Sequence, residues 1–330
     1  MPITKEQQIV SDFYENIGNV IKGHLIDIVE GPLVRNFIMK LPDMFSRTMA
    51  AKSAETNDYM LTYSDKRANI QVPTHTRQMV WFDKLVKTKE FKNSKASLPI
   101  ILGVDTFGKP IVMDLYTMPH LLITGRTGTG KTVLIKVLLK SLMAKFSPSE
   151  CKFVIFDPKG CDFVDAWDKN KYMLLPVEKF NIKFDLFDKI QQIVEDRYQI
   201  LADNKVKNLF EYRKKTRKKD MPHIIVAVDE ILDYMITNKK RMEEFVNAIC
   251  SKGRAVGVHL IFATQRPDKR GLTDIIKANF PSRVCFQARS VQEAKIMFDE
   301  PGPERLLGYG DMLYSDAGRV PIRIHTPYIA

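Results

Sequence analysis

Cysteine is scarce in this chain of 330 residues, and its placement excludes several classes of protein. The four cysteines form no Cys-x-x-Cys pair and have no histidine nearby at metal-ligand spacing. A structural zinc site and a disulfide framework are therefore not expected, and a reduced, cytoplasmic setting fits this composition. The four residues are Cys151, Cys161, Cys250 and Cys285.

Long hydrophobic runs are also missing. No stretch approaches the roughly 18 apolar residues that span a bilayer, and the first ten residues, MPITKEQQIV, are polar and lack the apolar core of a signal peptide. We therefore expect a soluble chain without membrane insertion of its own. A membrane anchor outside these residues and recruitment to the membrane by a partner both stay open.

The charge of the chain is positive but unevenly distributed. The formal net charge is +12, and Lys205–Lys219 alone contains eight basic residues and one acidic residue. The remaining excess is modest, so charge by itself is a limited argument for a polyanionic partner. The run Arg213–Lys219 fits a solvated loop and a peripheral DNA patch equally well.

The pattern of apolar and polar residues indicates two regions. Residues 1–95 fit a smaller α/β domain that ends in a polar, lysine-rich linker at 87–97. We expect helices at 5–22 and 45–55, a strand at 33–41, and a hairpin joining 59–63 to 68–72.

Residues 96–330 have a different texture, which predicts a larger α/β domain. A hairpin over 98–115 turns at Phe107–Gly108. Short apolar runs then alternate with amphipathic helical patterns, which indicates a mainly parallel sheet buried on both faces. These runs are 120–124, 152–156, 223–228, 259–264 and 283–288.

The segment Gly125–Thr132, GRTGTGKT, matches the phosphate-binding pattern G-x-x-x-x-G-K-[ST]. An apolar strand enters it and a helical pattern leaves it, which is the context that lets backbone amides surround the phosphates of ATP. Lys131 is expected to reach the β- and γ-phosphates, and Thr132 to bind Mg²⁺. The expected nucleotide-binding residues are Gly125, Arg126, Thr127, Gly128, Thr129, Gly130, Lys131, Thr132 and Val133.

A second apolar strand ends in two acidic residues, in the segment His223–Glu230. Asp229 is expected to hold Mg²⁺ directly or through water, and Glu230 to polarise the attacking water as a general base. The alternative is that both acids only cap the following helix. With a nucleotide loop upstream and the apolar strand 152–156 in between, the pattern is typical of a RecA-like ATPase that hydrolyses its nucleotide.

The strand 259–264 ends at Gln265, which would lie near the nucleotide and sense the γ-phosphate. A glutamine at a strand end is also a common loop residue, so this interpretation depends on the other motifs.

Five segments together resemble the FtsK/SpoIIIE family in order and spacing, and the resemblance covers about residues 98–328. They are GRTGTGKT, IIVAVDE, SKGRAVGVHLIFATQRPD, IIKANFPSRVCFQA and ERLLGYGDMLY. EGPLVRNFIMKL resembles the family's α domain more faintly, and no residues follow Ala330 for the winged-helix γ domain of some members.

The resemblance implies hexameric rings with ATP sites at subunit interfaces. Arg254 then matches the arginine that a neighbouring subunit supplies to the γ-phosphate, and Arg197 is a second candidate. A surface arginine near a helix C-terminus is the alternative for Arg254. The family model also directs one loop to the channel, where its cations would grip DNA phosphates without reading bases. These DNA-binding candidates are Arg266, Lys269, Arg270 and Lys277, with Lys159 on the same side.

These observations favour an ATP-dependent translocase of double-stranded DNA, acting in chromosome segregation, conjugative transfer, or phage or plasmid DNA handling. DNA stimulation of the ATPase is expected, as is a membrane-anchored or relaxase-type partner. The alternative is a protein-secretion ATPase of the type VII kind, which shares the nucleotide core. A third interpretation is an assembly factor that hydrolyses slowly and moves nothing, against which the full set of nucleotide-site residues argues.

Overall fold

The computed structural model describes residues 24–40, 60–64, 67–74, 78–163, 167, 169–179, 184–266, 268–316 and 319–329. The chain forms two compact units. The first is Met1–Met79 with Asp105–Lys109, and the second is Val80–Val104 with Pro110–Ala330. The units part between residues 79 and 80, whereas the sequence pattern places the boundary between 95 and 96. The helices expected at 5–22 and 45–55 lie outside the described residues.

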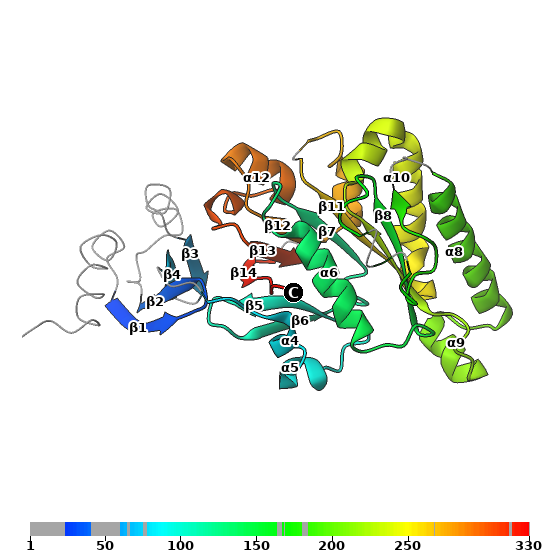
Figure 1. Cartoon of the computed structure of the whole chain (residues 1–330), viewed down its shortest axis with the longest axis horizontal. Coiled ribbons are helices and arrows are strands. Elements are labelled where there is room, and N and C mark those ends of the chain that lie inside the picture. Colours follow the sequence, from blue (N-terminus) through cyan, green and yellow to red (C-terminus); the bar gives the residue numbers. More distant parts are fainter. Residues whose placement is uncertain are drawn as a thin grey trace, which may run out of the picture. The chain divides into compact units, whose positions relative to one another are not determined.

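The described part of the first unit is a four-stranded antiparallel sheet in the order β1-β2-β4-β3 (Figure 1). Its strands are β1 (His24–Glu30), β2 (Val34–Lys40), β3 (Met60–Ser64) and β4 (Arg67–Pro73). The expected strand at 33–41 and the expected hairpin correspond to β2 and to β3–β4. Buried Asn36 donates to the carbonyl of Thr106 at 2.7 Å and accepts from Asn69 at 3.0 Å, so a polar pair lies within this sheet.

The second unit contains a ten-stranded sheet in the order β6-β5-β14-β13-β12-β7-β11-β10-β8-β9. The six strands from β12 to β9 pair in parallel, and β13 and β14 continue the sheet in antiparallel fashion. The strands are β5 (Pro99–Asp105), β6 (Pro110–Asp114), β7 (His120–Thr124), β8 (Cys151–Asp157), β9 (Glu178–Lys179), β10 (His223–Val228), β11 (Val258–Thr264), β12 (Ser282–Phe286), β13 (Asp311–Asp316) and β14 (Ile322–His325). The five apolar runs expected to be parallel strands are β7, β8, β10, β11 and β12.

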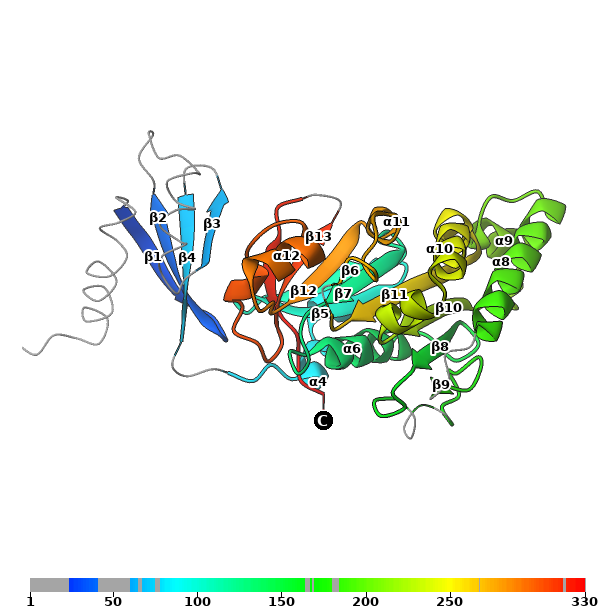
Figure 2. The same ribbon diagram turned by 90° about the horizontal axis from the view of Figure 1, so that it is seen from above.

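Helices cover both faces of this sheet, with α6 on one face and α10 on the other (Figure 2). Alternate residues of each central strand therefore enter different cores. On the α6 face, Leu134 and Leu138 join a cluster with Ile123 of β7. On the other face, the rings of Phe156 and Phe187 stack at 4.2 Å. The helices are α4 (Phe82–Leu85), α5 (Lys89–Lys92), α6 (Lys131–Met143), α8 (Asp185–Asp203), α9 (Leu209–Thr216), α10 (Ile231–Val256), α11 (Asp274–Asn279) and α12 (Val291–Phe298).

The composition of the lysine-rich segment 87–97 suggested a linker, but the segment is folded. It forms helix α5, and Phe91 is buried in a core that also contains Val137 of α6. The ammonium group of Lys145 lies 4.8 Å from the centre of the Phe91 ring. The burial of Phe91 therefore attaches this polar stretch to the core of the second unit.

Within the described residues, no helix combines the length and the apolar character needed to cross a bilayer.

Candidate nucleotide site

The loop that follows β7 has the backbone conformation that its glycines allow. Gly125, Gly128 and Gly130 adopt φ values of 142°, 79° and 121°, which disfavour residues with a side chain. A Cβ atom on Gly125 would lie 2.6 Å from the Cβ of Phe286 in β12. The loop ends at Gly130, the N-cap of α6, so the free amides of a 13-residue helix face it.

Lys131 is buried at the start of α6, and its ammonium group donates to the carbonyl of Arg126 at 2.6 Å. Burial lowers the pKa of this amine to about 8, although Asp229 and Glu230 act in the opposite direction. A buried cation with one carbonyl partner among the described residues is well suited to receive a phosphate, because the phosphate would supply a negative charge. The side chain of Val133 instead packs against the apolar cluster of Phe91 and Val137, so any contact of Val133 with a nucleotide would involve its backbone.

Thr132 and Asp229 come together from α6 and the end of β10. The Thr132 hydroxyl donates to Oδ1 of Asp229 at 3.3 Å. The other oxygen, Oδ2, is buried without a hydrogen-bond partner among the described residues. Burial, followed by the nearby charge of Asp162, raises the pKa of Asp229 to about 6. An unsatisfied carboxylate oxygen beside a hydroxyl is a donor set that fits Mg²⁺, which takes oxygen ligands.

Glu230 connects the end of β10 to the end of β11. Its Oε2 accepts from the backbone N–H of Gln265 at 3.0 Å, and its Oε1 accepts from Leu232 at 3.4 Å as the N-cap of α10. The Gln265 side chain accepts from the Thr127 hydroxyl of the nucleotide loop at 2.9 Å. Glu230, Gln265 and Thr127 therefore form a chain of contacts across β10, β11 and β7.

Three further residues support the nucleotide loop or the site beside it, and the sequence patterns did not indicate any of them as a site residue. The carbonyl of Gln287 accepts from the N–H of Arg126 at 3.2 Å, and the N–H of Gly310 donates to the carbonyl of Thr129 at 2.9 Å. Asp157, at the end of β8, is buried and accepts from three backbone amides, among them that of Gly160 at 3.0 Å. The position of Asp157 directly after an apolar run was the signal available for it.

Arg254 lies far from this loop along the fold. It is exposed in the last turn of α10, next to the start of β11, whereas the nucleotide loop follows the end of β7. Because β7 and β11 are parallel, these positions are at opposite edges of the sheet. Arg254 therefore cannot reach the nucleotide loop of its own chain.

Arg197, the second candidate for the arginine supplied to a neighbouring γ-phosphate, is not available for that role. It is buried in α8, and its guanidinium donates to the carbonyls of Pro222 and Val256, each at 2.9 Å. Its role in the fold is to satisfy these two carbonyls.

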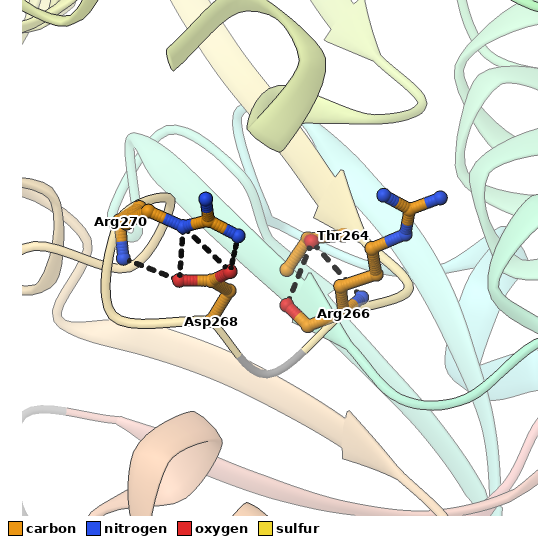
Figure 3. A network of polar contacts seen from close by, with 4 residues as sticks. All are labelled: Thr264, Arg266, Asp268 and Arg270. Atoms are coloured by element: carbon orange, nitrogen blue, oxygen red, sulfur yellow. Dashed lines mark hydrogen bonds and ion pairs between the residues drawn. The ribbon is translucent and has the colours of Figure 1, made fainter. Parts of the chain in front are cut away.

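The loop expected to contact DNA begins directly after Gln265, and its cations differ in accessibility. Arg266, Lys269 and Arg270 are exposed. Arg270 is bent back onto the carboxylate of Asp268 at 2.6 Å, while the guanidinium of Arg266 points away from this pair (Figure 3). Lys277 is half-buried and bound to Asp299 at 2.6 Å.

Lys159 has a position close to the nucleotide residues. It is exposed on the loop after β8, and its charge acts on both Lys131 and Asp229, lowering the pKa of each, although less than burial changes either value.

A cavity of about 720 Å³ lies between α10, α11 and α12, and lysines dominate its charged lining. Lys239 lines this cavity, although the sequence patterns did not indicate it as a candidate DNA contact. It directly follows Asn238, where α10 departs from helical geometry with φ −155° and ψ 84°. The charged lining residues are Lys239, Lys269, Asp274, Lys277 and Lys295.

The run Arg213–Lys219 begins within helix α9, where Asn208 caps the N-terminus and Arg217 takes the left-handed conformation at the end. Arg213 donates to the carbonyl of Met221 at 2.6 Å, whereas Lys214 and Lys218 are exposed.

Solved structures share this fold. The conjugation coupling protein TcpA of pCW3, solved as a monomer with ATPγS, is 21% identical, with a TM-score of 0.66, and the similarity covers 96% of this chain and 93% of TcpA. The cytoplasmic domain of the Thermomonospora curvata type VII secretion ATPase EccC is 21% identical with a TM-score of 0.67, over 76% of this chain and 32% of that one. The fold is thus that of a RecA-like P-loop ATPase.

Curated relatives are more similar in sequence. The DNA translocase FtsK of Rickettsia typhi is 31% identical over 94% of this chain and 47% of its own length, so the chain spans about half of that relative. The DNA translocase FtsK of Haemophilus influenzae is 32% identical over 94% of this chain and 66% of its own length.

The model of the FtsK/SpoIIIE family matches residues 83–269. This range is more than half of the chain, and it contains the nucleotide loop, Asp229, Glu230 and Gln265. The chain therefore belongs to the FtsK/SpoIIIE family.

Proposed function

We propose that this chain is an ATP-dependent motor that translocates double-stranded DNA. Its nucleotide site would bind Mg²⁺-ATP. Lys131 would bind the β- and γ-phosphates, Thr132 and Asp229 would hold the metal ion, and Glu230 would orient and deprotonate the attacking water. When bound, the Mg²⁺ ion would neutralise charge that develops on the phosphates.

The observation that carries the proposal is the hydrogen bond between Glu230 and the N–H of Gln265. Each residue stands at the start of a segment that lines the lysine cavity. Glu230 caps α10, which contains Lys239, and Gln265 begins the loop that contains Lys269. A change at the γ-phosphate that displaces Glu230 or Gln265 would therefore move these lysines, which is the coupling that a motor needs.

Four lysines and one aspartate are the charged residues that line this cavity, and this positive excess suits contacts with the phosphates of a polyanion such as double-stranded DNA. We assign backbone phosphates to Lys269 and Lys295, together with exposed Arg266. The pairs of Arg270 with Asp268 and of Lys277 with Asp299 make those two cations weaker candidates than the sequence suggested.

Sites shared between copies would complete the motor. Arg254 is exposed at the edge of the sheet opposite the nucleotide loop, so it would act on the γ-phosphate of a neighbouring copy in a ring, with a hexamer as the expected assembly. The first unit would correspond to the family's α domain, and recruitment to a membrane would depend on a partner.

The test is the steady-state ATPase rate with and without linear double-stranded DNA over a salt series, beside Lys131→Ala. We expect stimulation that declines as salt rises and is absent in the variant. The triple variant R266A/K269A/K295A should bind DNA with a salt dependence shallower by about two to three units in log–log slope. A matched control, K214A/K215A/K218A in the α9 run, should leave that slope unchanged.

A rate that DNA does not change at low salt would overturn the proposal. The type VII secretion fold makes peptides the next substrates to test, and stimulation by a peptide in place of DNA would support a protein-secretion ATPase.

A further inference from the structure

The guanidinium of Arg254 lies over an aromatic ring. Its Cζ atom is 5.0 Å from the centre of the Tyr116 ring. Tyr116 belongs to the turn between β6 and β7, so two segments 138 residues apart in the sequence meet here. A cation over a ring face is held in place by the quadrupole of the ring, and its N–H groups stay available to another acceptor. A carboxylate partner would instead occupy those donors and cancel the charge.

The turn that holds Tyr116 is itself fixed. The Asp114 carboxylate accepts from the backbone N–H groups of Ser97 at 2.9 Å, Leu98 at 2.8 Å and Tyr116 at 3.0 Å. A carboxylate with three amide donors leaves the turn little freedom.

The ring of Tyr116 is also confined by its neighbours. It meets Phe210 of α9 edge to face, with centres 4.9 Å apart, and His259 of β11 with centres 6.2 Å apart. Because backbone and ring are both held, Tyr116 offers Arg254 a rigid platform rather than a mobile contact.

We propose that Tyr116 is a positioning residue that orients Arg254 for a phosphate held by a neighbouring copy. This inference rests on the proposed function, because it needs Arg254 to act between subunits. The geometry assigns three roles. Asp114 fixes the turn, Phe210 and His259 fix the ring, and the ring fixes the direction of the guanidinium.

The experiment compares kcat and KM for ATP at saturating DNA in variants of the whole 330-residue chain. Tyr116→Leu removes the π face but keeps an apolar side chain, and we expect kcat to fall about tenfold with KM changed less than about twofold. Tyr116→Phe keeps the ring and should restore kcat. Tyr198→Leu is a matched control that should leave kcat unchanged. The Tyr198 ring of α8 lies 5.9 Å from the ammonium group of Lys252, which is in α10 like Arg254.

A double-mutant cycle separates positioning from simple packing. In an Arg254→Ala background, Tyr116→Leu should cause no further loss, since the group that it orients is gone. A full tenfold loss in that background, or a Tyr116→Leu variant with wild-type kcat, would overturn the inference while leaving the role of Arg254 intact. An Arg254→Ala variant with wild-type kcat would overturn both.

Mixing two variants tests action between copies. Tyr116→Leu subunits keep a complete nucleotide loop, and Lys131→Ala subunits keep a well-oriented Arg254. A mixture should hydrolyse ATP faster than the mean of the two preparations, because some Tyr116→Leu sites gain an intact neighbour. A rate equal to that mean would contradict the inference.

Discussion

The parallel strands of the large sheet end at one side, which we call the nucleotide edge, and β7, β10 and β11 begin at the opposite side, which we call the histidine edge. These two edges use buried polar groups in opposite ways. At the edge where the strands end, Lys131, Asp157, Asp229 and Glu230 are buried charged residues around the nucleotide loop. At the edge where β7, β10 and β11 begin, the buried polar residues include His120, His223 and His259, and burial is the main cause that lowers the pKa of each.

The difference teaches what each edge is built to do. A buried charge without a full set of partners costs stability but binds an oppositely charged ligand strongly. A buried neutral histidine carries no net charge at neutral pH and fills space with aromatic contacts, as in the pair His223–His259 with ring centres 5.8 Å apart. The first edge is therefore suited to bind phosphate and metal, and the second to support Tyr116 and Arg254.

The largest expected effect comes from a change at the nucleotide edge alone. Glu230→Gln removes the proposed base but keeps an oxygen that accepts from the N–H of Gln265, so we expect kcat to fall by about 10²–10⁴-fold with ATP binding retained. Rapid-quench turnover and fluorescent-nucleotide titration measure the two quantities. A variant with kcat within about threefold of wild type would show that Glu230 only caps α10.

The second prediction concerns acid stability at the histidine edge. The pKa of His120 is lowered to about 3 and that of His259 to about 4, so the unfolded chain binds more protons below pH 6.5. Their stabilising effect is complete above pH 6.5 and is lost as pH falls toward 4. From pH 7.5 to pH 5, each histidine should lower the free energy of unfolding by roughly 2 kcal/mol.

Urea titrations at pH 7.5 and pH 5 check this sign. His259→Leu is expected to be less stable at pH 7.5, because the Pro119 carbonyl loses its contact, but to lose less stability on acidification. Hydrogen bonds that Ser147 donates to the Glu150 carboxylate lower the pKa of Glu150 to about 2, so this group titrates below the pH window of the experiment. An equal acid loss in wild type and variant would assign the effect elsewhere.

The smallest effect is a gain of stability at the nucleotide edge. The pKa of Asp229 is raised to about 6 from an ordinary value of 3.8, so the folded chain binds the extra proton and stability falls as pH rises through 6. At pH 7.5, Asp229→Asn should therefore stabilise the nucleotide-free protein by roughly 3 kcal/mol, which corresponds to about 6–12 °C in Tm.

Calorimetry with and without Mg²⁺-ATP tests both sides of this exchange. The wild type should gain Tm on adding the ligand, whereas Asp229→Asn should gain much less, because its metal ligand is gone. A nucleotide-free variant that melts below the wild type would contradict the assignment of Asp229 as a strained buried charge.

Much of the second unit could be predicted because its signals are local. Each central parallel strand is a short apolar run, and the nucleotide loop is a contiguous motif at the junction of β7 and α6. The segment 87–97 shows where such reasoning fails. Its composition is that of a linker, yet Phe91 finds a buried site that exists only after α6 is in place.

By itself, the sequence determined the family and the mainly parallel α/β core, and it predicted the chemistry at Lys131, Thr132, Asp229 and Glu230, because these depend on motifs of a few consecutive residues. Only the tertiary structure decided which distant residues meet. The strand order β12-β7-β11-β10 brings Gln265 between Thr127 and Glu230 and separates Arg254 from its own nucleotide loop. It also folds Tyr116 against Arg254 and buries Arg197. Strand order arises from the packing of the whole core, which no short segment encodes.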